Sequence, residues 1–412
     1  MSEYTPAALT IKIDRKRDDG QLEISFDVEE SHYGSFNNSS GLTPKYYETE
    51  LANFREQMSK WSKAYEKYQE QGDDPLTCNP ERVKEVWKEL AQWGRDRYRE
   101  LFDLETESSR DLIGWSEALK RLKGERIVVD SSIGHIPWGL LYDEEVPDSL
   151  EGDYLEKLLD HFWITSYQLE VLPEYPKDRV FWKPSLKNDE STRLIVTINK
   201  DIKGSYGIAQ DSFFNGLAPR LKAVAKSPPS TLVVNYDKNK VIESITNREE
   251  PQHLIYFFCH HKKAGGNLSA RGYRNLEDTK MIIQGEDPKV STATLGLKEM
   301  RRNERIKGFS SPPVVFLNAC ESSQTEIGDP SSFMFYFVNI LKSYAFIGTE
   351  AEIPAGFADE FGRHFVSEFL SAKPIGEIMY AARRDFALKH HNPFGLYYTL
   401  FGNGNVRLEQ PV

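Results

Sequence analysis

The chain has 412 residues, of which 39% are hydrophobic and 28% charged, so it can bury a sizeable core and is not of disordered composition. It carries 52 basic and 63 acidic residues, and the formal net charge of -11 argues against a nucleic-acid-binding surface. No apolar run approaches the roughly 18 residues of a membrane helix, and the start lacks a signal-peptide core. We expect a cytoplasmic protein that binds neither nucleic acid nor membrane.

The N-terminal part predicts a hairpin and a pair of helices. Apolar residues alternate over 8–13 and 22–28 around Asp19-Gly20, which is typical of a β-hairpin. A helical pattern rich in aromatic residues follows from about Pro44 to Gln71. A second helix is predicted from Pro80 to Phe102, where apolar residues recur at helical spacing. We expect the two helices to form an antiparallel pair on the main body.

From residue 126 onward, short apolar strands alternate with helices. Strands are predicted over 126–130, 162–169, 192–198, 230–236, 253–259, 279–284, 313–320, 344–349 and 396–402. Helices are predicted over 213–226, 240–247, 293–303, 331–343, 357–370 and 374–389. Several strands are apolar at nearly every position, as strands covered on both faces must be. This order predicts a three-layer α/β sandwich with a mainly parallel sheet, interrupted by a proline- and charge-rich connection over 173–191.

The three cysteines are too few and too widely spaced for a disulfide framework. The chain has no CxxC or HExxH motif and no Cys/His cluster, so we expect no metal site. Cys259 lies inside an apolar run and is interpreted as core filler, and Cys78 lies in a predicted loop. Cys320 is different because it follows an apolar strand and precedes a polar loop.

Two predicted strands end at reactive residues. One runs into His260 and His261, and the other runs into Cys320 and Glu321. Because ligands bind at the carboxyl ends of parallel strands, a thiol and an imidazole would meet at one edge of the sheet if these strands are neighbours. The imidazole would raise the thiolate fraction of Cys320 and later protonate the leaving amine. Cys320 also precedes a predicted helix, whose dipole favours a thiolate.

Five stretches of the sequence carry a resemblance to one family. They are 255–260, similar to "HFACH"; 315–322, similar to "VFLNACES"; 345–349, similar to "AVIGT"; 373–384, similar to "KPVGEALRAARR"; and 135–142, similar to "LPWELLYD". Together they resemble the CHAT domain, a caspase-like fold of the clan that holds caspases and separases. The resemblance covers roughly Arg126 to Val412.

The resemblance implies a caspase-like endopeptidase that needs no cofactor. Cys320 matches the family's nucleophile and His260 its catalytic histidine. The backbone N–H groups of Cys320 and His261 would form the oxyanion hole, although the family usually has glycine where this chain has His261. The implied organisation is an N-terminal accessory region over 1–105, a pseudo-caspase half without catalytic residues over 106–190, and a catalytic half over 191–412.

Several polar residues near the predicted nucleophile are candidates for substrate binding. Glu350 and Glu352 stand where the family often has apolar residues, and they would favour a basic substrate side chain. Asn318 and Glu321 flank the nucleophile, although Glu321, like Asp329, could equally cap the next helix. These four residues, Asn318, Glu321, Glu350 and Glu352, are the predicted substrate contacts.

The resemblance also implies partners. Such proteases are generally found in bacterial signalling and antiviral defence systems, so we expect a protein substrate and a regulatory protein that docks on the N-terminal region. The alternative is a catalytically silent pseudo-protease that holds a partner in the same cleft, for which His261 is the best support. A nucleotide-binding α/β protein is a third possibility, but no Gly-rich phosphate loop follows any predicted strand.

Overall fold

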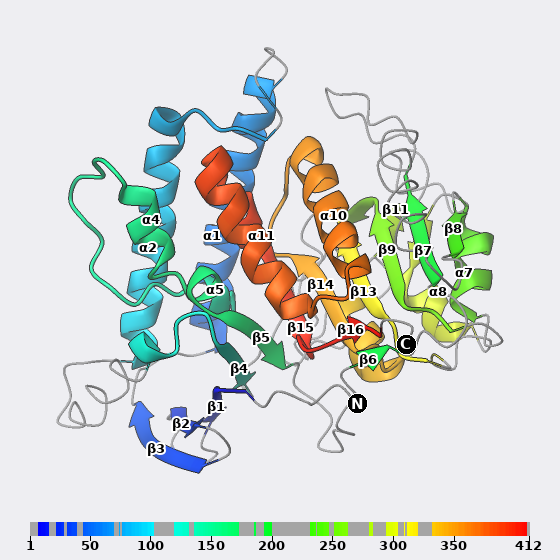
Figure 1. The fold of residues 1–412 in the computed structure, drawn as a ribbon, viewed down its shortest axis with the longest axis horizontal. Coiled ribbons are helices and arrows are strands. Elements are labelled where there is room, and N and C mark those ends of the chain that lie inside the picture. The colour runs from blue at the N-terminus through cyan, green and yellow to red at the C-terminus, as the bar shows by residue number, and fades with distance from the viewer. Residues whose placement is uncertain are drawn as a thin grey trace.

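The computed structural model describes residues 7–15, 22–28, 31–38, 44–69, 74, 76–102, 119–131, 136–172, 185–186, 193–199, 231–235, 237–246, 251–262, 280–282, 294–303, 309, 311–319 and 332–409. Figure 1 shows these residues as one α/β body in which α10 (Ala355–Leu370) and α11 (Ile375–His390) lie side by side across one face of a sheet. The predicted α/β class is confirmed.

Within the described residues, eleven strands form one sheet in the order β3-β2-β1-β4-β5-β15-β14-β13-β9-β7-β8. Their bounds, in this order, are Ser31–Asn38, Leu22–Val28, Leu9–Arg15, Arg126–Ser131, Gln168–Leu172, Tyr398–Gly402, Ala345–Thr349, Val314–Asn318, Leu254–Phe258, Arg193–Ile198 and Thr231–Asn235. The described residues also form two small, separate sheets. One consists of β10 (His260–Lys262), β11 (Lys280–Ile282) and β12 (Thr294–Gly296), and the other of β16 (Arg407–Leu408) and β6 (Ser185–Leu186).

The central sheet consists of two parallel blocks that run in opposite directions. Block A is β14, β13, β9, β7 and β8, which are mutually parallel. Block B is β1, β4, β5 and β15, which are also mutually parallel. The blocks meet where β14 pairs antiparallel with β15, from Ala345 opposite Gly402 to Thr349 opposite Tyr398. Their carboxyl ends therefore lie on opposite edges of the sheet.

Alternate residues of the block A strands enter two separate cores. In β13, Val314 and Phe316 pack with α10 and α11, whereas Val315 and Leu317 pack with α7 (Lys238–Thr246) and α8 (Leu297–Arg302). Since both faces are covered, the four residues Val314–Leu317 are all apolar, and this explains the continuous hydrophobic run before Asn318. The three predicted layers are present.

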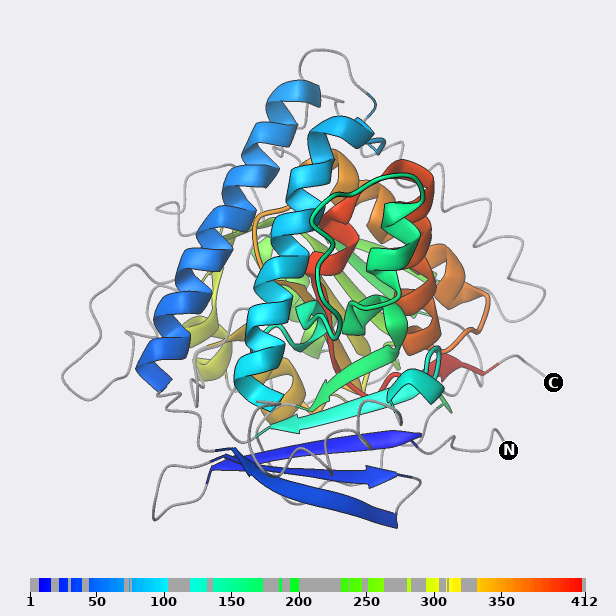
Figure 2. The same cartoon turned by 90° about the vertical axis from the view of Figure 1, so that its left-hand side faces the viewer.

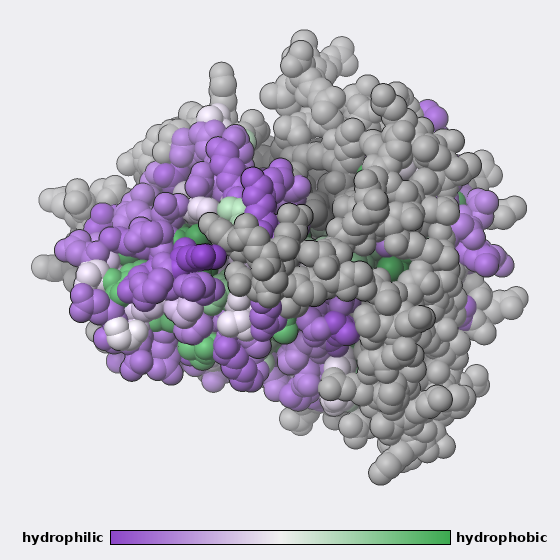
Figure 3. Space-filling view, turned by 90° about the horizontal axis from the view of Figure 1, so that it is seen from above, coloured by the Kyte–Doolittle hydropathy of each residue, from purple (hydrophilic) through white to green (hydrophobic). Residues whose placement is uncertain are grey.

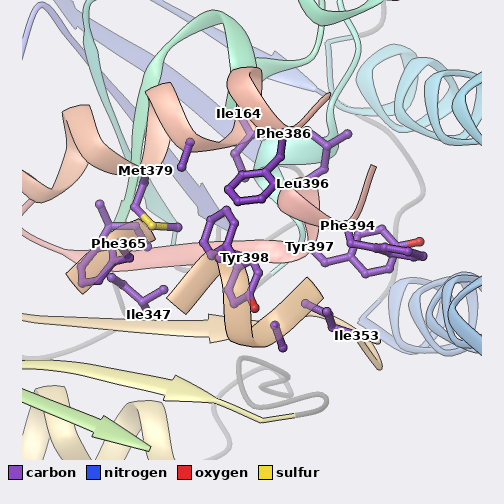
Figure 4. Packing of buried hydrophobic residues seen from close by; sticks show 14 of the residues in the cluster. Ile164, Ile347, Ile353, Phe365, Met379, Phe386, Phe394, Leu396, Tyr397 and Tyr398 are labelled. Atoms are coloured by element: carbon purple, nitrogen blue, oxygen red, sulfur yellow. The ribbon is translucent and has the colours of Figure 1, made fainter. Parts of the chain in front are cut away.

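The first of these cores is closed by aromatic side chains from the two C-terminal helices. In Figure 4, Phe365 of α10 and Met379 of α11 point toward Ile347 of β14 and Tyr398 of β15. Phe361 of α10 is stacked on Tyr398, with ring centroids 4.2 Å apart. The helices are thereby fixed over the boundary between the two blocks.

The N-terminal elements extend and cover block B. The predicted hairpin is confirmed as β1 and β2, and the structure adds β3, which the sequence did not indicate. Because β1 pairs parallel with β4, these strands continue the central sheet, as Figure 2 shows. Helices α1 (Pro44–Gln69) and α2 (Pro80–Phe102) lie side by side, and Phe54 stacks on Trp93 with centroids 3.9 Å apart. The predicted helical pair is confirmed.

Two predicted elements were wrong in part. The strand expected over 162–169 is instead the short helix α5 (Trp163–Ser166) followed by β5. All four residues of α5 are buried, so the hydrophobic periodicity could not distinguish a helix from a strand. The hydroxyl of Thr165 donates to the carbonyl of Leu159, 2.6 Å away. The helix expected over 293–303 is divided into β12 and α8.

The helix predicted over 331–343 is only partly formed in the described residues. Residues 331–343 contain one helical turn, α9 (Phe333–Phe335), and the π-helical turn η3 (Tyr336–Ile340). Helix α4 (Tyr154–Leu159) contacts α11 and α2, and the 3-10 turn η1 (Trp138–Leu140) contacts α5 and α2. The 3-10 turn η4 (Pro393–Tyr397) leads into β15. The helix predicted over 213–226 and the connection over 173–191 lie outside the described residues, apart from β6. None of the described helices is long and apolar enough to span a membrane.

Candidate active site

The two strands that lead to His260 and Cys320 are neighbours. Strands β9 and β13 are parallel, and their register places Phe258 opposite Asn318 at the carboxyl ends. His260 and Cys320 each follow two residues beyond this pair in the sequence. Paired strands lie about 4.8 Å apart, so the two strands that precede these positions end side by side at one edge of the sheet. The side chain of His260 and the whole of Cys320 lie outside the described residues, so their contact remains a prediction.

Asn318 holds the carboxyl end of β13, the strand that precedes Cys320. It is buried, and its Nδ2 donates to the Tyr256 hydroxyl at 2.9 Å and to the carbonyl of Ala358 at 2.7 Å. Its Oδ1 accepts from the Tyr398 hydroxyl at 2.8 Å. One side chain thus connects β13 to β9, β15 and α10. These contacts give Asn318 a structural role where we predicted a substrate contact.

A second contact holds the residue before Cys320. The hydroxyl of Thr349, at the end of β14, donates to the carbonyl of Ala319 over 2.6 Å, and both residues are buried. The next residue after Thr349 is Glu350, which is 0% exposed. Its Oε2 accepts from Arg55 Nη2 of α1 at 2.9 Å, and its Oε1 accepts from the hydroxyl of Thr399 at 2.6 Å. This burial does not fit the predicted contact of Glu350 with a substrate.

Glu352 lies in a more open position than Glu350. Its side chain is 36% exposed and forms an ion pair with Lys63 of α1, whose Nζ is 2.9 Å from Oε2. The backbone carbonyl of Glu352 also accepts from the hydroxyl of Ser62 at 2.6 Å. The segment after β14 is therefore held by α1 through both Arg55 and Ser62. Glu321, the fourth predicted substrate contact, lies outside the described residues.

The histidine side of the site is carried by the small sheet. Strand β10 continues almost directly from β9 and pairs antiparallel with β11, so that His260 lies opposite Ile282 and His261 opposite Met281. The predicted oxyanion role of the His261 and Cys320 N–H groups is not tested by this geometry. It remains a prediction.

Asp359 is an acidic residue near this edge that the sequence did not reveal. It lies on α10 next to Ala358, is buried, and pairs with Arg363, whose Nη2 is 2.6 Å from Oδ2. Burial raises the pKa of the Asp359 carboxyl from 3.8 to about 6, and Arg363 opposes this only in part. Helical spacing alone could not mark it as buried. Within the described part of the chain, no group of three or more His, Cys, Asp or Glu side chains could hold a metal ion.

Comparison with known proteins identifies structures with a similar fold. No family model matches the chain. Over 97% of its length the chain matches the Saccharomyces cerevisiae separase in a separase–securin complex, with a TM-score of 0.50 and 13% identity, and it covers 30% of that chain. The chain has a separase-like α/β fold. The Drosophila initiator caspase Dronc matches over 57% of the chain and 89% of its own, with a TM-score of 0.33 and 8% identity.

A bacterial relative was found by sequence. A Vitiosangium sp. protein named "Probable protease" is 26% identical over 190 residues, which are 46% of this chain. The chain spans 23% of the length of that relative and 30% of the separase chain. The likeness to separase shows the fold of this chain alone.

Proposed function

We propose that the chain is a cysteine endopeptidase of the CHAT type that cleaves a specific protein in a bacterial signalling or antiviral defence system. The observation that carries the proposal is the register of β9 and β13, because the strands that precede His260 and Cys320 in the sequence end side by side at one edge of the sheet. The separase-like fold, the relative named as a protease and the five CHAT-like stretches support it.

The proposed reaction follows from the two side chains. His260 takes the proton of Cys320, and the thiolate attacks the carbonyl carbon of the scissile peptide bond. The resulting oxyanion accepts from the N–H groups of Cys320 and His261. His260 then gives its proton to the leaving amine, and the C–N bond breaks to give a thioester. A water molecule, deprotonated by His260, hydrolyses the thioester and releases the thiol. No cofactor takes part.

A carboxylate close to the nucleophile would favour a basic substrate side chain. Because Glu350 is fully buried, we assign this preference to Glu352, which is partly exposed although it is paired with Lys63, and to Glu321. A peptide library cut by the wild type should then show Lys or Arg before the cleavage point. In Glu352→Gln this preference should weaken, whereas Glu368→Gln, on the far end of α10, should leave it unchanged.

We also propose that a regulatory protein docks on the N-terminal region. Helix α1 holds the segment after β14 through Arg55 and Ser62, so a partner that shifts α1 would act on a segment next to Ala319. Exposed positions on α1 include Glu56 and Lys60. Where Figure 3 colours the described residues, the surface seen from above is mainly hydrophilic, which favours a charged rather than an apolar contact.

A photo-crosslinker tests this docking surface. Placed at Lys60, it should capture a protein in cells that contain the activating system. The matched position is Leu388 on α11, which is also exposed. Equal capture at both positions would contradict docking on α1.

The test of the activity uses mass spectrometry of cleaved peptides together with a thiol-reactive peptide probe. Cleavage should be lost in Cys320→Ala and in His260→Ala. The probe should label Cys320, and the labelling should fall in His260→Ala. Cys78 and Cys259 are buried, and burial raises the pKa of Cys78 to about 12, so they are internal controls that should stay unlabelled. Labelling of Cys320 that does not depend on His260, without any cleavage, would favour the pseudo-protease.

A further inference from the structure

Asn199 is a buried residue that contacts the chain on both sides of His260. It follows β7 directly and is 2% exposed. Its backbone N–H donates to the carbonyl of Phe258, 2.8 Å away, and its side-chain Nδ2 donates to the carbonyl of Ile282, 3.0 Å away. One residue therefore joins the end of β7 to the end of β9 and to β11.

The two acceptors define the position of the His260 backbone. Phe258 is the last residue of β9 and precedes His260 by two residues, while Ile282 is the register partner of His260 in the β10–β11 pair. At this point the chain leaves the central sheet and enters the small sheet. Asn199 thus bonds both to β9, the strand before His260, and to β11, the strand opposite His260, and it holds the two strands at a fixed distance from each other.

The Asn199 side chain forms a buried hydrogen bond that a hydrophobic residue could not form. Asparagine is unusual in a buried site, because its amide must find partners there. At Asn199 the amide donates to a backbone carbonyl that lies 83 residues away in sequence, so it contributes a long-range connection. A catalytic side chain needs support of this kind, since an error of about 0.5 Å or 10–20° impairs its function.

We infer that Asn199 is a positioning residue that aims His260 at Cys320. The inference rests on the proposed function, because it presupposes the Cys320–His260 dyad. Asn199 takes no part in bond making. Replacing its side chain keeps the backbone bond to Phe258 and removes the bond to Ile282, so β11 and its register partner His260 are expected to shift and the imidazole to support the thiolate less well.

The test measures the alkylation of Cys320 by iodoacetamide as a function of pH, resolved by peptide mass spectrometry in the full chain. His260→Ala gives the reference without an imidazole. Asn199→Ala should lower the rate at pH 7 by about threefold to tenfold and raise the apparent pKa of the Cys320 thiol toward that of His260→Ala. In the double variant, Asn199→Ala should add nothing to the effect of His260→Ala, because both act through one group.

The matched control is Asn392→Ala. Asn392 is also buried, at 1% exposure, and bridges backbone groups by donating to the carbonyl of Leu76 and accepting from the N–H of Phe394. This variant should lose a similar amount of thermal stability and keep the wild-type alkylation profile. If Asn199→Ala does not fold, Asn199→Leu replaces it in the test. Leucine keeps approximately the shape of the side chain without its N–H donors, and the pH profile of Cys320 alkylation is again the measurement.

The outcomes distinguish the positioning role of Asn199 from the Cys320–His260 dyad itself. A wild-type profile in Asn199→Ala, together with a changed profile in His260→Ala, would overturn the positioning role and leave the dyad intact. An unchanged profile in His260→Ala would overturn the dyad itself. An additive double variant would show that Asn199 acts on Cys320 by another route and would also overturn the inference.

Discussion

Blocks A and B have the same design and differ in what their strand ends carry. Both consist of buried parallel strands, and each contains a buried ion pair: Arg55–Glu350 beside block A and Arg126–Glu170 in block B. In block A the pair lies next to Thr349, which holds the residue before Cys320. In block B the pair joins β4 to β5 within the sheet. A similar interaction can therefore support a reactive edge in one block and only the fold in the other.

The largest expected effect comes from removing the cation of each pair. Arg55→Met and Arg126→Met each leave a buried glutamate without its arginine, which should lower the free energy of unfolding by about 3–5 kcal/mol. Urea unfolding followed by tryptophan fluorescence measures this loss. The two variants should be similarly destabilised, because Glu350 and Glu170 are both almost fully buried.

The same two variants should differ in reactivity. At a temperature where both are folded, Arg55→Met should change the alkylation rate of Cys320 by about threefold or more, because it releases Glu350 beside the Thr349–Ala319 contact. Arg126→Met should leave the rate as in the wild type. If both variants altered the rate equally, the proposed division between the blocks would be wrong.

Asp359 should give the next largest effect, and its sign is opposite to that of an ordinary paired carboxylate. Its pKa in the folded protein is raised to about 6, above the ordinary value of 3.8, so the folded state binds the proton more tightly. Its contribution to stability is thus complete below about pH 4 and is lost as the pH rises to about 6, a change of up to about 3 kcal/mol. The stability of Asp359→Asn relative to the wild type should rise over this range. A difference that stays constant with pH would contradict this.

Asn318→Ala should destabilise block A by about 2–3 kcal/mol. The substitution leaves the carbonyl of Ala358 and the hydroxyl of Tyr398 without their Asn318 partner in a buried site. Tyr398→Phe removes only the hydroxyl that donates to Asn318 Oδ1, so it should cost less than Asn318→Ala when measured by thermal unfolding. Equal losses in both variants would mean that the Nδ2 contacts of Asn318 contribute little.

The smallest effects are expected from two glycines, one beside each block. A methyl group at Gly362 would lie 2.2 Å from the hydroxyl of Tyr256, and one at Gly404 would lie 2.3 Å from Oε1 of Glu170. Gly362→Ala and Gly404→Ala should each cost about 1–3 kcal/mol through overpacking. Tyr256→Phe removes the clashing hydroxyl, so the double variant with Gly362→Ala should be more stable than additivity predicts. Strict additivity in thermal unfolding would show that no such clash occurs.

Much of block A could be predicted from sequence, because its physics is local. Strands β9 and β13 are buried at all five positions, and apart from Asn318 at the end of β13 these residues are hydrophobic or aromatic, which is the signature of a strand covered on both faces. The adjacency of the two strands could be anticipated from their reactive ends. Helix α5 was missed because a short buried run has the same composition in either conformation.

The long-range contacts could not be predicted in this way. Arg55 and Glu350 are 295 residues apart, and neither lies in a pattern that marks it as buried. The reversal of direction between β14 and β15 depends on which strands come together in space, and strand composition does not record it. Asn199 follows an ordinary apolar strand, and only the fold reveals what its amide contacts.

The reversal at β14 and β15 also bears on self-association. In many α/β proteins the last strand of a parallel sheet is a free edge that can recruit the same strand of another molecule. Here β15 is hydrogen-bonded on both sides by strands of its own chain, β14 and β5. Among the described strands, the free edges of the central sheet are β3 and β8, at its two ends. Any assembly by intermolecular strand addition to this sheet would have to begin at one of those outer strands and would leave the junction of the two blocks untouched.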